Sequence, residues 1–303
     1  MAKPFLKWAG GKTQLLSSIE KALPKALAEK NFIYIEPFVG SGAVLFWILN
    51  NFPGIKKAVI NDVNFDLINT YEIIASKAKE LIFILKEFQI EYHSIENSEE
   101  CKKKYYYQKR ELYNLRNSDK VLQAALFIFL NRTCFNGLYR VNKVNDFNVP
   151  KGSYKLPTIC DKENILAVSE ALKKVEILCG DYIKTLEHSE SNSFFYFDPP
   201  YKPISSTSNF NSYAKNEFND EEQIRLKDFC RKLTELGHKW MLSNADVKGK
   251  DFSNNFFDDI YSEFLINRVK AKRIINSNTQ KRGEITELLI TNYTKEIAAP
   301  VIF

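Results

Sequence analysis

Short apolar runs recur along the chain, and most of them end in Gly, Asp, Asn or Pro, as buried strands of an open α/β sheet do. Apolar residues at three- and four-residue spacing between the runs predict helices over Thr13–Ala28 and Asp220–Leu236, the second capped at Asn219. Seven apolar runs predict strands at Phe32–Val39, Lys57–Asp62, Val175–Cys179, Ser193–Asp198, Lys239–Asn244, Asp258–Ile266 and Ile285–Tyr293. The pattern therefore predicts an α/β chain with a seven-stranded sheet.

The alternation of strands and helices breaks between the second and third predicted strands. From about residue 65 to residue 156 the pattern is helical and then polar, without a convincing core strand. We therefore expect a catalytic domain of residues 1–65 and 165–303, with an inserted, mainly helical domain of residues 66–164. Within the insert, Asn136-Gly137, Asp146, Pro150 and Gly152 predict turns around a hairpin or an extended loop.

Composition narrows the class of protein. The 303 residues are 45% hydrophobic and 26% charged, which excludes a disordered tail, a fibre or a low-complexity scaffold. The longest apolar run, near Leu126–Leu130, is too short to cross a bilayer, and no secretory stretch is present, so we expect a cytoplasmic protein without a membrane role. Dispersed cysteines and histidines predict a reducing compartment and no metal site. The net charge of +6 is compatible with nucleic acid but ordinary.

The ends of the first two predicted strands suggest a nucleoside cofactor. The first strand runs into Phe38-Val39-Gly40-Ser41-Gly42, where glycines let the backbone bend and approach a ligand closely. The second strand ends in Asp62, about twenty positions later, which suits hydrogen bonds to ribose hydroxyls. Each feature also has a plain alternative: tight packing for the glycines and a helix cap for Asp62. Because the full dinucleotide fingerprint is missing, a dinucleotide is not the first expectation.

The segment after the fourth predicted strand, Asp198-Pro199-Pro200-Tyr201, is the most informative one. Two prolines cannot continue a sheet, so the chain must leave it with Asp198 and a backbone carbonyl pointing outward. A carboxylate beside a carbonyl accepts both hydrogens of an exocyclic amino group, and Tyr201 offers a face on which a planar base can stack. The plain alternative is a strand that ends in a proline turn.

These residues carry a family resemblance. Phe38-Val39-Gly40-Ser41-Gly42 and Asp198-Pro199-Pro200-Tyr201 resemble the two signature motifs of S-adenosylmethionine-dependent amino methyltransferases. Their order, with the insert between them, resembles the alpha group of DNA adenine-N6 methyltransferases, above all the Dam and DpnM methylases that modify adenine in GATC. The segment Phe5–Lys12 is similar to that group's N-terminal cofactor motif. Phe135–Arg140, with Phe147–Pro150, is similar to its target-recognition hairpin.

The resemblance implies a Rossmann-like class I methyltransferase sheet, S-adenosyl-L-methionine as cofactor and a catalytic set of Asp198, Pro199, Pro200 and Tyr201. In this interpretation Asp181 accepts from the amino group of the cofactor's adenine and Tyr182 stacks on that ring. A helix cap is the alternative for Asp181. The implied cofactor-binding residues are Trp8, Ala9, Lys12, Glu36, Phe38, Gly40, Gly42, Asp62, Asp181, Tyr182 and Asp198.

The resemblance also implies a double-stranded DNA partner. Phe135 would enter the base stack, Asn136 would lie near the orphaned base, and Arg140 would contact a guanine edge or, alternatively, a phosphate. Core packing is the alternative for Phe135 and Leu138. The residues Arg268–Arg273 and Lys281-Arg282, which we call the basic run, are expected on a loop between the last two strands and would bind phosphate or form a solvated face. The implied DNA-binding residues are Lys7, Phe135, Asn136, Leu138, Arg140, Asn142, Pro150, Lys270, Lys272 and Arg273.

Three functions are compatible with these features. The favoured one is a site-specific DNA methyltransferase that acts on N6 of adenine, within GATC, after flipping the base into the Asp198 pocket. It would act alone or beside a separate cognate restriction endonuclease, as a monomer or weak dimer in the bacterial cytoplasm. The second is a related enzyme acting on an RNA base or a protein amide. The third is a DNA-binding protein with a decayed site.

Overall fold

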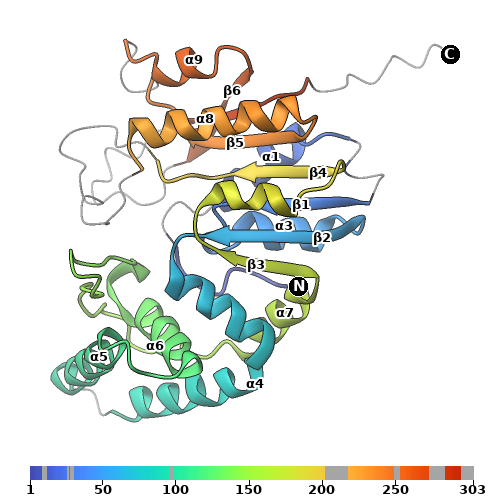
Figure 1. The fold of residues 1–303 in the computed structure, drawn as a ribbon. Helices are drawn as coiled ribbons and strands as arrows, with labels where there is room; N and C mark the ends of the chain where they lie inside the picture. Colours follow the sequence, from blue (N-terminus) through green and yellow to red (C-terminus); the bar gives the residue numbers. More distant parts are fainter. Residues whose placement is uncertain are drawn as a thin grey trace.

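A computed structural model describes residues 1–8, 12–25, 27, 31–95, 98–201, 218–248, 253–272 and 284–294 of the chain. Its centre is a seven-stranded sheet in the order β3-β2-β1-β4-β5-β7-β6 (Figure 1). Neighbouring strands from β3 to β5 pair in parallel, whereas β7 pairs antiparallel with β5 and with β6. The strands are β1 Phe32–Glu36, β2 Ile55–Asp62, β3 Val175–Cys179, β4 Ser193–Phe197, β5 Lys239–Ala245, β6 Leu265–Lys272 and β7 Glu284–Thr291.

Helices pack around this sheet and form the insert below it (Figure 1). No helix among the described residues is long and apolar enough to span a membrane. The α-helices are α1 Leu16–Ala22, α3 Ala43–Asn51, α4 Phe65–Ser94, α5 Glu99–Asn114, α6 Lys120–Thr133, α7 Lys162–Ala171, α8 Asp220–Glu235 and α9 Phe256–Ile260. Short 3₁₀ segments are η1 Lys12–Gln14, η2 Phe135–Gly137, η3 Leu172–Lys174 and η4 Tyr182–His188.

The central strands are buried on both faces. Every residue of β1 and β4 is buried, which is why their sequences are continuous apolar runs rather than alternating ones. Tyr34 and Tyr196 point into one hydrophobic cluster, while their neighbours Ile35 and Phe197 point into a second cluster on the other face. Each fully buried large side chain contributes about 1.5–3 kcal/mol through removal from water.

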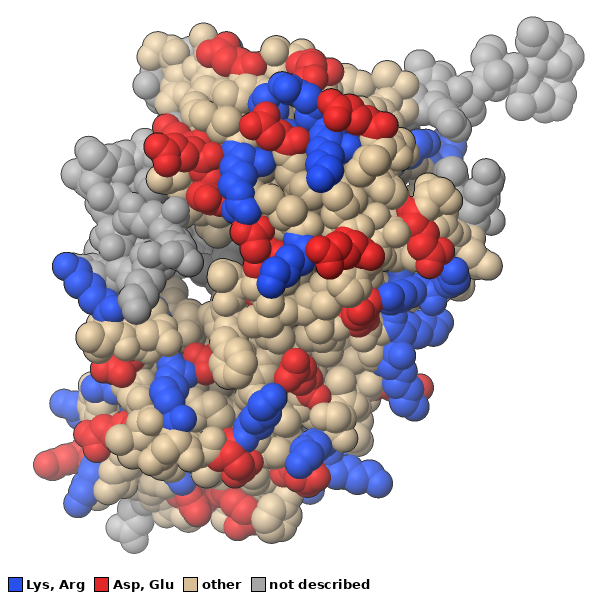
Figure 2. All heavy atoms as spheres, viewed as in Figure 1, with Lys and Arg blue, Asp and Glu red and all other residues tan. Residues whose placement is uncertain are grey.

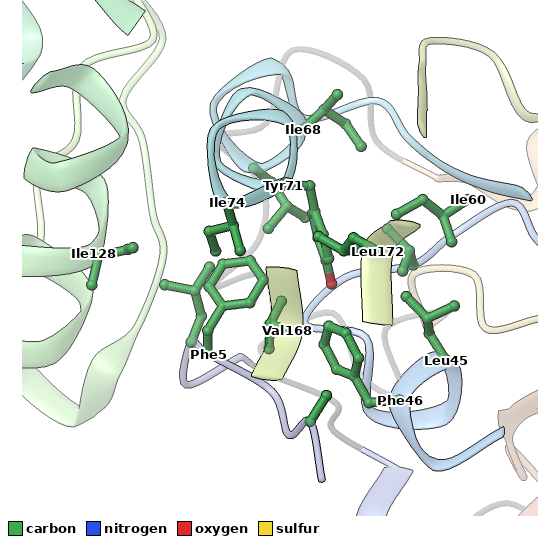
Figure 3. Close-up of a cluster of buried hydrophobic side chains, with 14 of the residues drawn as sticks. Phe5, Leu45, Phe46, Ile60, Ile68, Tyr71, Ile74, Ile128, Val168 and Leu172 are labelled. Atoms are coloured by element: carbon green, nitrogen blue, oxygen red, sulfur yellow. The ribbon is translucent and has the colours of Figure 1, made fainter. Parts of the chain in front are cut away.

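Helix α4 carries the first of these clusters from the sheet into the insert. Tyr71 and Ile74 of α4 lie beside Phe46 of α3 and the N-terminal Phe5, and Ile128 of α6 closes the cluster from the side of the insert (Figure 3). Helix α4 has non-helical dihedral angles at Lys77, between its sheet-side and insert-side halves. The boundary predicted at residue 66 falls inside this helix, so the insert shares its core with the sheet layer.

A buried asparagine joins the N-terminal segment to the insert. Asn131 of α6 accepts from the Lys7 backbone N–H at 2.9 Å and donates to the carbonyls of Lys7 and Gly137 at 2.8 and 3.0 Å. Its side chain is 2% exposed, so these bonds have no competition from water. The amide therefore fixes Lys7 against the loop that follows α6.

The sixth predicted strand has different bounds in the structure. The strand prediction at Asp258–Ile266 is wrong in its first half, because Asp258 lies in the first turn of α9, where a carboxylate favours a helix N-terminus. Strand β6 begins at Leu265 and continues through the basic residues to Lys272. An edge strand tolerates such charges because one side faces solvent. The prediction that the basic run lies on a loop is therefore wrong for Arg268 to Lys272, whereas Arg273, Lys281 and Arg282 lie outside the described residues.

The first predicted helix is much shorter than expected. The prediction of one continuous helix over Thr13–Ala28 is wrong, because α1 ends at Ala22. Leu23 has an extended ψ of 144° because the following Pro24 excludes the helical conformation at the preceding residue. In contrast, the predicted cap of the second helix is confirmed, since the Asn219 side chain accepts from the Glu222 N–H at 3.0 Å.

The Asn136-Gly137 turn does not lie at the tip of the loop, where the sequence placed it. These residues have φ values of 54° and 64°, and they form the 3₁₀ segment η2 rather than the tip of a hairpin. A Cβ on Gly137 would lie 2.5 Å from the Lys7 side chain, so the close approach of these segments requires glycine here.

The tip lies farther along, in what we call the insert loop, residues 134–152. Two isolated antiparallel bridges, Cys134–Lys151 and Val141–Phe147, hold its two sides together in place of regular strands. At the tip, Asn142 Oδ1 accepts from the Asp146 N–H at 2.8 Å. The extended-loop alternative therefore describes this segment better than a regular hairpin.

Asn131→Ala should lower the free energy of unfolding by about 2–4 kcal/mol, because it removes the partners of three backbone groups, of Lys7 and Gly137, that bond to the buried amide. Urea denaturation followed by circular dichroism measures this change. Asn51→Ala is the matched control, since its exposed side chain makes one bond within α3; the control should lose less than about 1 kcal/mol. Equal losses in the two variants would contradict the role of Asn131.

Candidate functional site

The candidate site lies where the parallel strands end. In Figure 1 the arrows of β2 and β4 point to the side on which the insert helices α5 and α6 lie below the sheet. Asp62 is the last residue of β2, and Asp198 directly follows β4. The carboxyl edge of a parallel sheet is where open α/β proteins bind their ligands.

The glycine loop after β1 packs closely under an aromatic side chain. Gly40 has a φ of 48°, and a Cβ there would lie 3.1 Å from Trp8 Cδ1. Trp8 in turn stacks on Tyr139 of the insert loop, with ring centroids 5.5 Å apart. Tyr71 donates from its hydroxyl to the Gly40 carbonyl at 3.0 Å. Three distant segments therefore hold this loop, and only glycine fits at its centre.

Asp62 both shapes this loop and retains capacity for a ligand. Its carboxylate accepts from the N–H of Gly40 at 3.1 Å and from the N–H of Asn64 at 2.9 Å. Burial raises the pKa of Asp62, while these backbone donors pull it back down. A carboxylate has about four acceptor positions, so lone pairs remain for further donors. The residue that caps the following helix α4 is Asn64, whose side chain accepts from the Leu67 N–H, so the cap alternative for Asp62 is wrong.

Glu36 and Phe38 occupy different environments at the end of β1. Glu36 is 2% exposed and accepts from the Tyr34 hydroxyl at 2.7 Å. Burial raises the pKa of Glu36 well above its usual range, with Asp198 adding to the rise. Phe38 packs against Tyr182, with ring centroids 5.1 Å apart. The direct cofactor contact assigned to Glu36 stays a prediction.

The loop after β3 brings Asp181 and Tyr182 toward the same edge. Asp181 caps η4 by accepting from the Ile183 N–H, as its plain alternative proposed, and also pairs with Arg225 at 2.6 Å. Burial would raise the pKa of Asp181, but the Ile183 N–H and Arg225 outweigh it and hold the pKa below its usual value. The Arg225 guanidinium lies 5.0 Å from the Tyr182 ring centroid.

Asp198 lies in a cluster with Lys12, Ser243 and Tyr201. Lys12 Nζ is 2.9 Å from Asp198 Oδ1, and Ser243 donates to the same oxygen at 3.1 Å. Burial raises the pKa of Asp198 to about 6, and Lys12 and Ser243 limit the rise. Lys12 also donates to the Tyr201 hydroxyl and lies 4.1 Å from the centroid of that ring. The N-terminal motif and the Asp-Pro-Pro-Tyr motif therefore meet directly.

Glu287 of β7 completes this cluster, although no sequence motif pointed to it. The Tyr201 hydroxyl donates to Glu287 Oε2 at 2.6 Å, and Lys12 Nζ lies 3.6 Å from that oxygen. Burial, together with the Asp198 and Glu287 carboxylates, raises the pKa of Tyr201 well above its usual value. Tyr201 is therefore a protonated donor fixed between an ammonium and a carboxylate.

The carbonyls of Pro199 and Pro200 have different partners. The Pro200 carbonyl accepts from Gln223 Nε2 at 3.2 Å, which ties the segment to α8. None of the described residues donates to the Pro199 carbonyl. Within the described part of the chain, an acceptor without an internal donor therefore follows Asp198 directly, as expected for a contact with an amino group.

The insert loop presents several of the predicted DNA-binding residues on its surface. Phe135 is 50% exposed and Leu138 is 39% exposed, so neither is a core residue. Lys7 lies against this loop, with its Nζ 4.1 Å from the Tyr154 ring centroid. Pro150 is exposed, and its carbonyl accepts from the Phe135 N–H at 2.8 Å. The structure therefore brings these residues together.

Arg140 and Asn142 lie at the open end of this loop. The Arg140 guanidinium donates to Asn148 Oδ1 at 2.6 Å through Nε, and to the Asn148 carbonyl at 3.3 Å through Nη2. Arg140, Asn142, Lys143, Val144 and Asn148 line a surface hollow of about 450 Å³. Asn148 therefore orients Arg140, whereas Asn142 forms the turn at the tip.

The basic run after residue 267 is only partly described. Arg268 pairs with Asp246 at 3.1 Å and with Asp258 at 2.6 Å, so its charge is satisfied within the protein. Lys270 is exposed on β6. The Lys272 side chain, together with Ala9 and Arg273, lies outside the described part of the chain, and their roles stay predictions. Lys and Arg side chains alternate with Asp and Glu over the face seen in Figure 2.

Several supporting residues had no signal in the sequence. Asn61 donates to the carbonyls of Pro37 and Gly180, and so ties the loops after β1 and β3 together beside Asp62. Ser243 and Glu287 reach Asp198 and Tyr201 from strands far away along the chain. Only the strand order, which places β5 next to β4 and β7 next to β5, could have indicated them.

Comparisons with known proteins agree with this site. The chain is 50% identical over 295 residues to the type II methyltransferase M.MjaIII of Methanocaldococcus jannaschii, covering 96% of this chain and 99% of that protein. It is 37% identical to the DNA adenine methylase of Haemophilus influenzae, covering 95% and 92% of the two chains. The same enzyme of Escherichia coli K12 is 34% identical, with 95% and 94% covered.

The family model described as D12 class N6 adenine-specific DNA methyltransferase matches residues 8–275, which include Trp8, Asp62 and Asp198. This match confirms the resemblance inferred from the glycine loop and the Asp-Pro-Pro-Tyr segment. The relatives extend the similarity over nearly the whole length of the chain. The chain therefore belongs to the D12 class of N6 adenine-specific DNA methyltransferases.

Proposed function

We propose that this adenine-specific DNA methyltransferase takes its methyl group from S-adenosyl-L-methionine and transfers it to an adenine flipped out of duplex DNA, within GATC. The observation that carries the proposal is the pair of acceptors at the end of β4. Asp198 and the Pro199 carbonyl follow each other there, beside the glycine loop and Asp62. An RNA base or a protein amide as substrate, and a decayed site, are less consistent with the family and with the complete cluster around Asp198.

The residues around the glycine loop fit an adenosine-containing cofactor. Because Gly40 has no Cβ, the Trp8 ring can lie directly against the backbone of the glycine loop. Asp62 keeps acceptor positions for ribose hydroxyls after it has bound the N–H groups of Gly40 and Asn64. Phe38, which follows β1, and Tyr182, which follows β3, pack against each other and supply aromatic groups at the same edge of the sheet. We propose that these groups bind the nucleoside.

The reaction needs little from the protein beyond position and charge. S-adenosyl-L-methionine supplies a methyl group that is already activated by a positive sulfur. Asp198 and the Pro199 carbonyl would each accept one hydrogen of the adenine amino group, which directs its lone pair toward the methyl group. Tyr201 would stack on the base. Most of the rate acceleration would come from in-line alignment and from electrostatics matched to the transition state.

Target choice is proposed to lie in the insert loop. Phe135 is exposed at a position from which it can enter the space left by the flipped base, with Asn136 beside it. Arg140 is held by Asn148 through Nε and Nη2, and its guanidinium is proposed to contact a guanine edge. Lys7 touches the same loop and is proposed to reach the first guanine. A role beside a separate restriction endonuclease follows only from the relatives named type II methyltransferases.

Asp198→Ala should lower methyl transfer at least about a hundredfold while the variant still binds cofactor, because the carboxylate's partner is the target amino group. Transfer of labelled methyl groups to a GATC duplex measures the loss, and calorimetry measures cofactor binding. Ser243→Ala is the matched control: it removes one neutral donor to Asp198 and should cost less than about tenfold. An Asp198→Ala variant with more than about a tenth of wild-type turnover would refute the assignment.

The single-turnover rate should fall as pH decreases through about 6, because only the ionised Asp198 accepts a hydrogen at both oxygens. Below that pH the rate should decrease about tenfold per pH unit. Since Lys12 lowers the pKa of Asp198, Lys12→Met should move the midpoint to higher pH. Rapid-quench measurements over about pH 5–8 test both statements. A flat profile in the wild type would exclude Asp198 as the titrating acceptor.

Arg140→Ala should raise the activation free energy of methyl transfer by about 1–3 kcal/mol on GATC, because a bidentate guanine contact is lost. The rise should be smaller on duplexes altered at one guanine-bearing pair. Turnover at fixed salt on GATC and its single-base variants measures this discrimination. Arg140→Lys keeps the charge but loses the fork, so it should behave like the Ala variant. A uniform loss on all duplexes, rescued by Lys, would show that Arg140 binds phosphate instead.

A further inference from the structure

The cluster around Asp198 contains a carboxylate that the proposed chemistry does not use. Glu287 is 13% exposed, and Oε2 of its side chain accepts from Tyr201 at 2.6 Å and lies 3.6 Å from Lys12 Nζ. Lys12 is only 4% exposed, and its other carboxylate partner is Asp198. The described ammonium of this cluster therefore faces two carboxylates at once.

These three charges do not cancel. Lys12 carries one positive charge, while Asp198 and Glu287 carry two negative ones, so the described cluster has a net charge of −1. Because the groups are largely withdrawn from water, an uncompensated charge acts more strongly here than at the surface. A ligand that brings one positive charge would neutralise the cluster, whereas a neutral ligand of the same shape would not.

We propose that Glu287 makes this site selective for a cationic methyl donor over the neutral thioether that remains after transfer. The proposal rests on the proposed function, in which the donor is a sulfonium. During transfer a carbon–sulfur bond breaks and a nitrogen–carbon bond forms. The bonding pair stays on sulfur, so the positive charge passes to the amino nitrogen and leaves as a proton. The product therefore lacks the charge that Glu287 favours.

The consequence is that the product leaves the site more readily than the methyl donor does. Donor and product share every part except the methyl group and its charge, so contacts to the nucleoside and amino acid parts cannot distinguish them. A carboxylate beside the reacting centre can, because its attraction is present before transfer and absent afterwards. Glu287 would thereby weaken product inhibition without touching the target base.

Substitutions at Glu287 separate charge from position. Glu287→Gln keeps an oxygen that accepts from Tyr201 but removes the negative charge, leaving Lys12 and Asp198 balanced. Glu287→Asp keeps the charge on a shorter side chain. Glu263→Gln is the control, because Glu263 is a partly exposed carboxylate paired with Arg231.

The experiment measures dissociation constants of S-adenosylmethionine and S-adenosylhomocysteine by calorimetry at about pH 8, where Asp198 is ionised. The Gln variant should bind the sulfonium about tenfold more weakly, which corresponds to about 1.4 kcal/mol, and the thioether nearly unchanged. The Asp variant and the Glu263→Gln control should retain the wild-type ratio of the two constants. Thermal unfolding confirms that each variant is folded.

The outcomes differ clearly. An equal weakening of both ligands, or an unchanged ratio in the Gln variant, would overturn the proposal. If the wild type bound neither ligand, the proposed cofactor itself would be wrong, which is a different failure. Should the Gln variant not fold, the wild type still tests the charge: an analogue with an ammonium in place of the sulfonium must bind more tightly than the thioether. Equal affinity of these two would refute the selectivity.

Discussion

The buried ion pair between Lys12 and Asp198 is the interaction on which the site depends. It joins the N-terminal segment to the end of β4 at 2.9 Å, and so brings together two motifs that are 186 positions apart. A charge removed from water must be compensated, and here Lys12 limits the rise in the pKa of Asp198 that burial causes. Ionised Asp198 is a strong hydrogen-bond acceptor. Protonated Asp198 would instead point its own hydrogen at the amino group from which it is proposed to accept.

The sequence predicted those parts of the fold that local physics controls. The buried strands β1 and β4 were recognisable because both faces are covered, which makes each one a continuous apolar run that ends in a polar or proline residue. Glycines with positive φ, such as Gly40, and the prolines after Asp198 marked the loops at the carboxyl edge. Edge strand β6 was misplaced because its charged residues, including Arg268, do not follow a buried pattern.

The supporting residues of the site could not be found in the same way. Ser243 and Glu287 belong to strands β5 and β7, and nothing in their neighbourhood along the chain distinguishes them from other polar residues of a sheet. Their importance comes from the strand order, which places them beside the segment after β4. Asn131 is a similar case, since an asparagine near a helix end gives no sign that it holds Lys7 from 124 positions away.

The arrangement of these supports fits the proposal that one small site serves two ligands. The glycine loop is held by Asp62 of β2 and Tyr71 of α4, whereas Lys7 and Gly137 are held by Asn131 of the insert. Trp8 stands between them, over Gly40 on one side and stacked on Tyr139 on the other. Because α4 and the shared core join the sheet layer and the insert in one packed unit, a change in the insert loop can reach the glycine loop through Trp8.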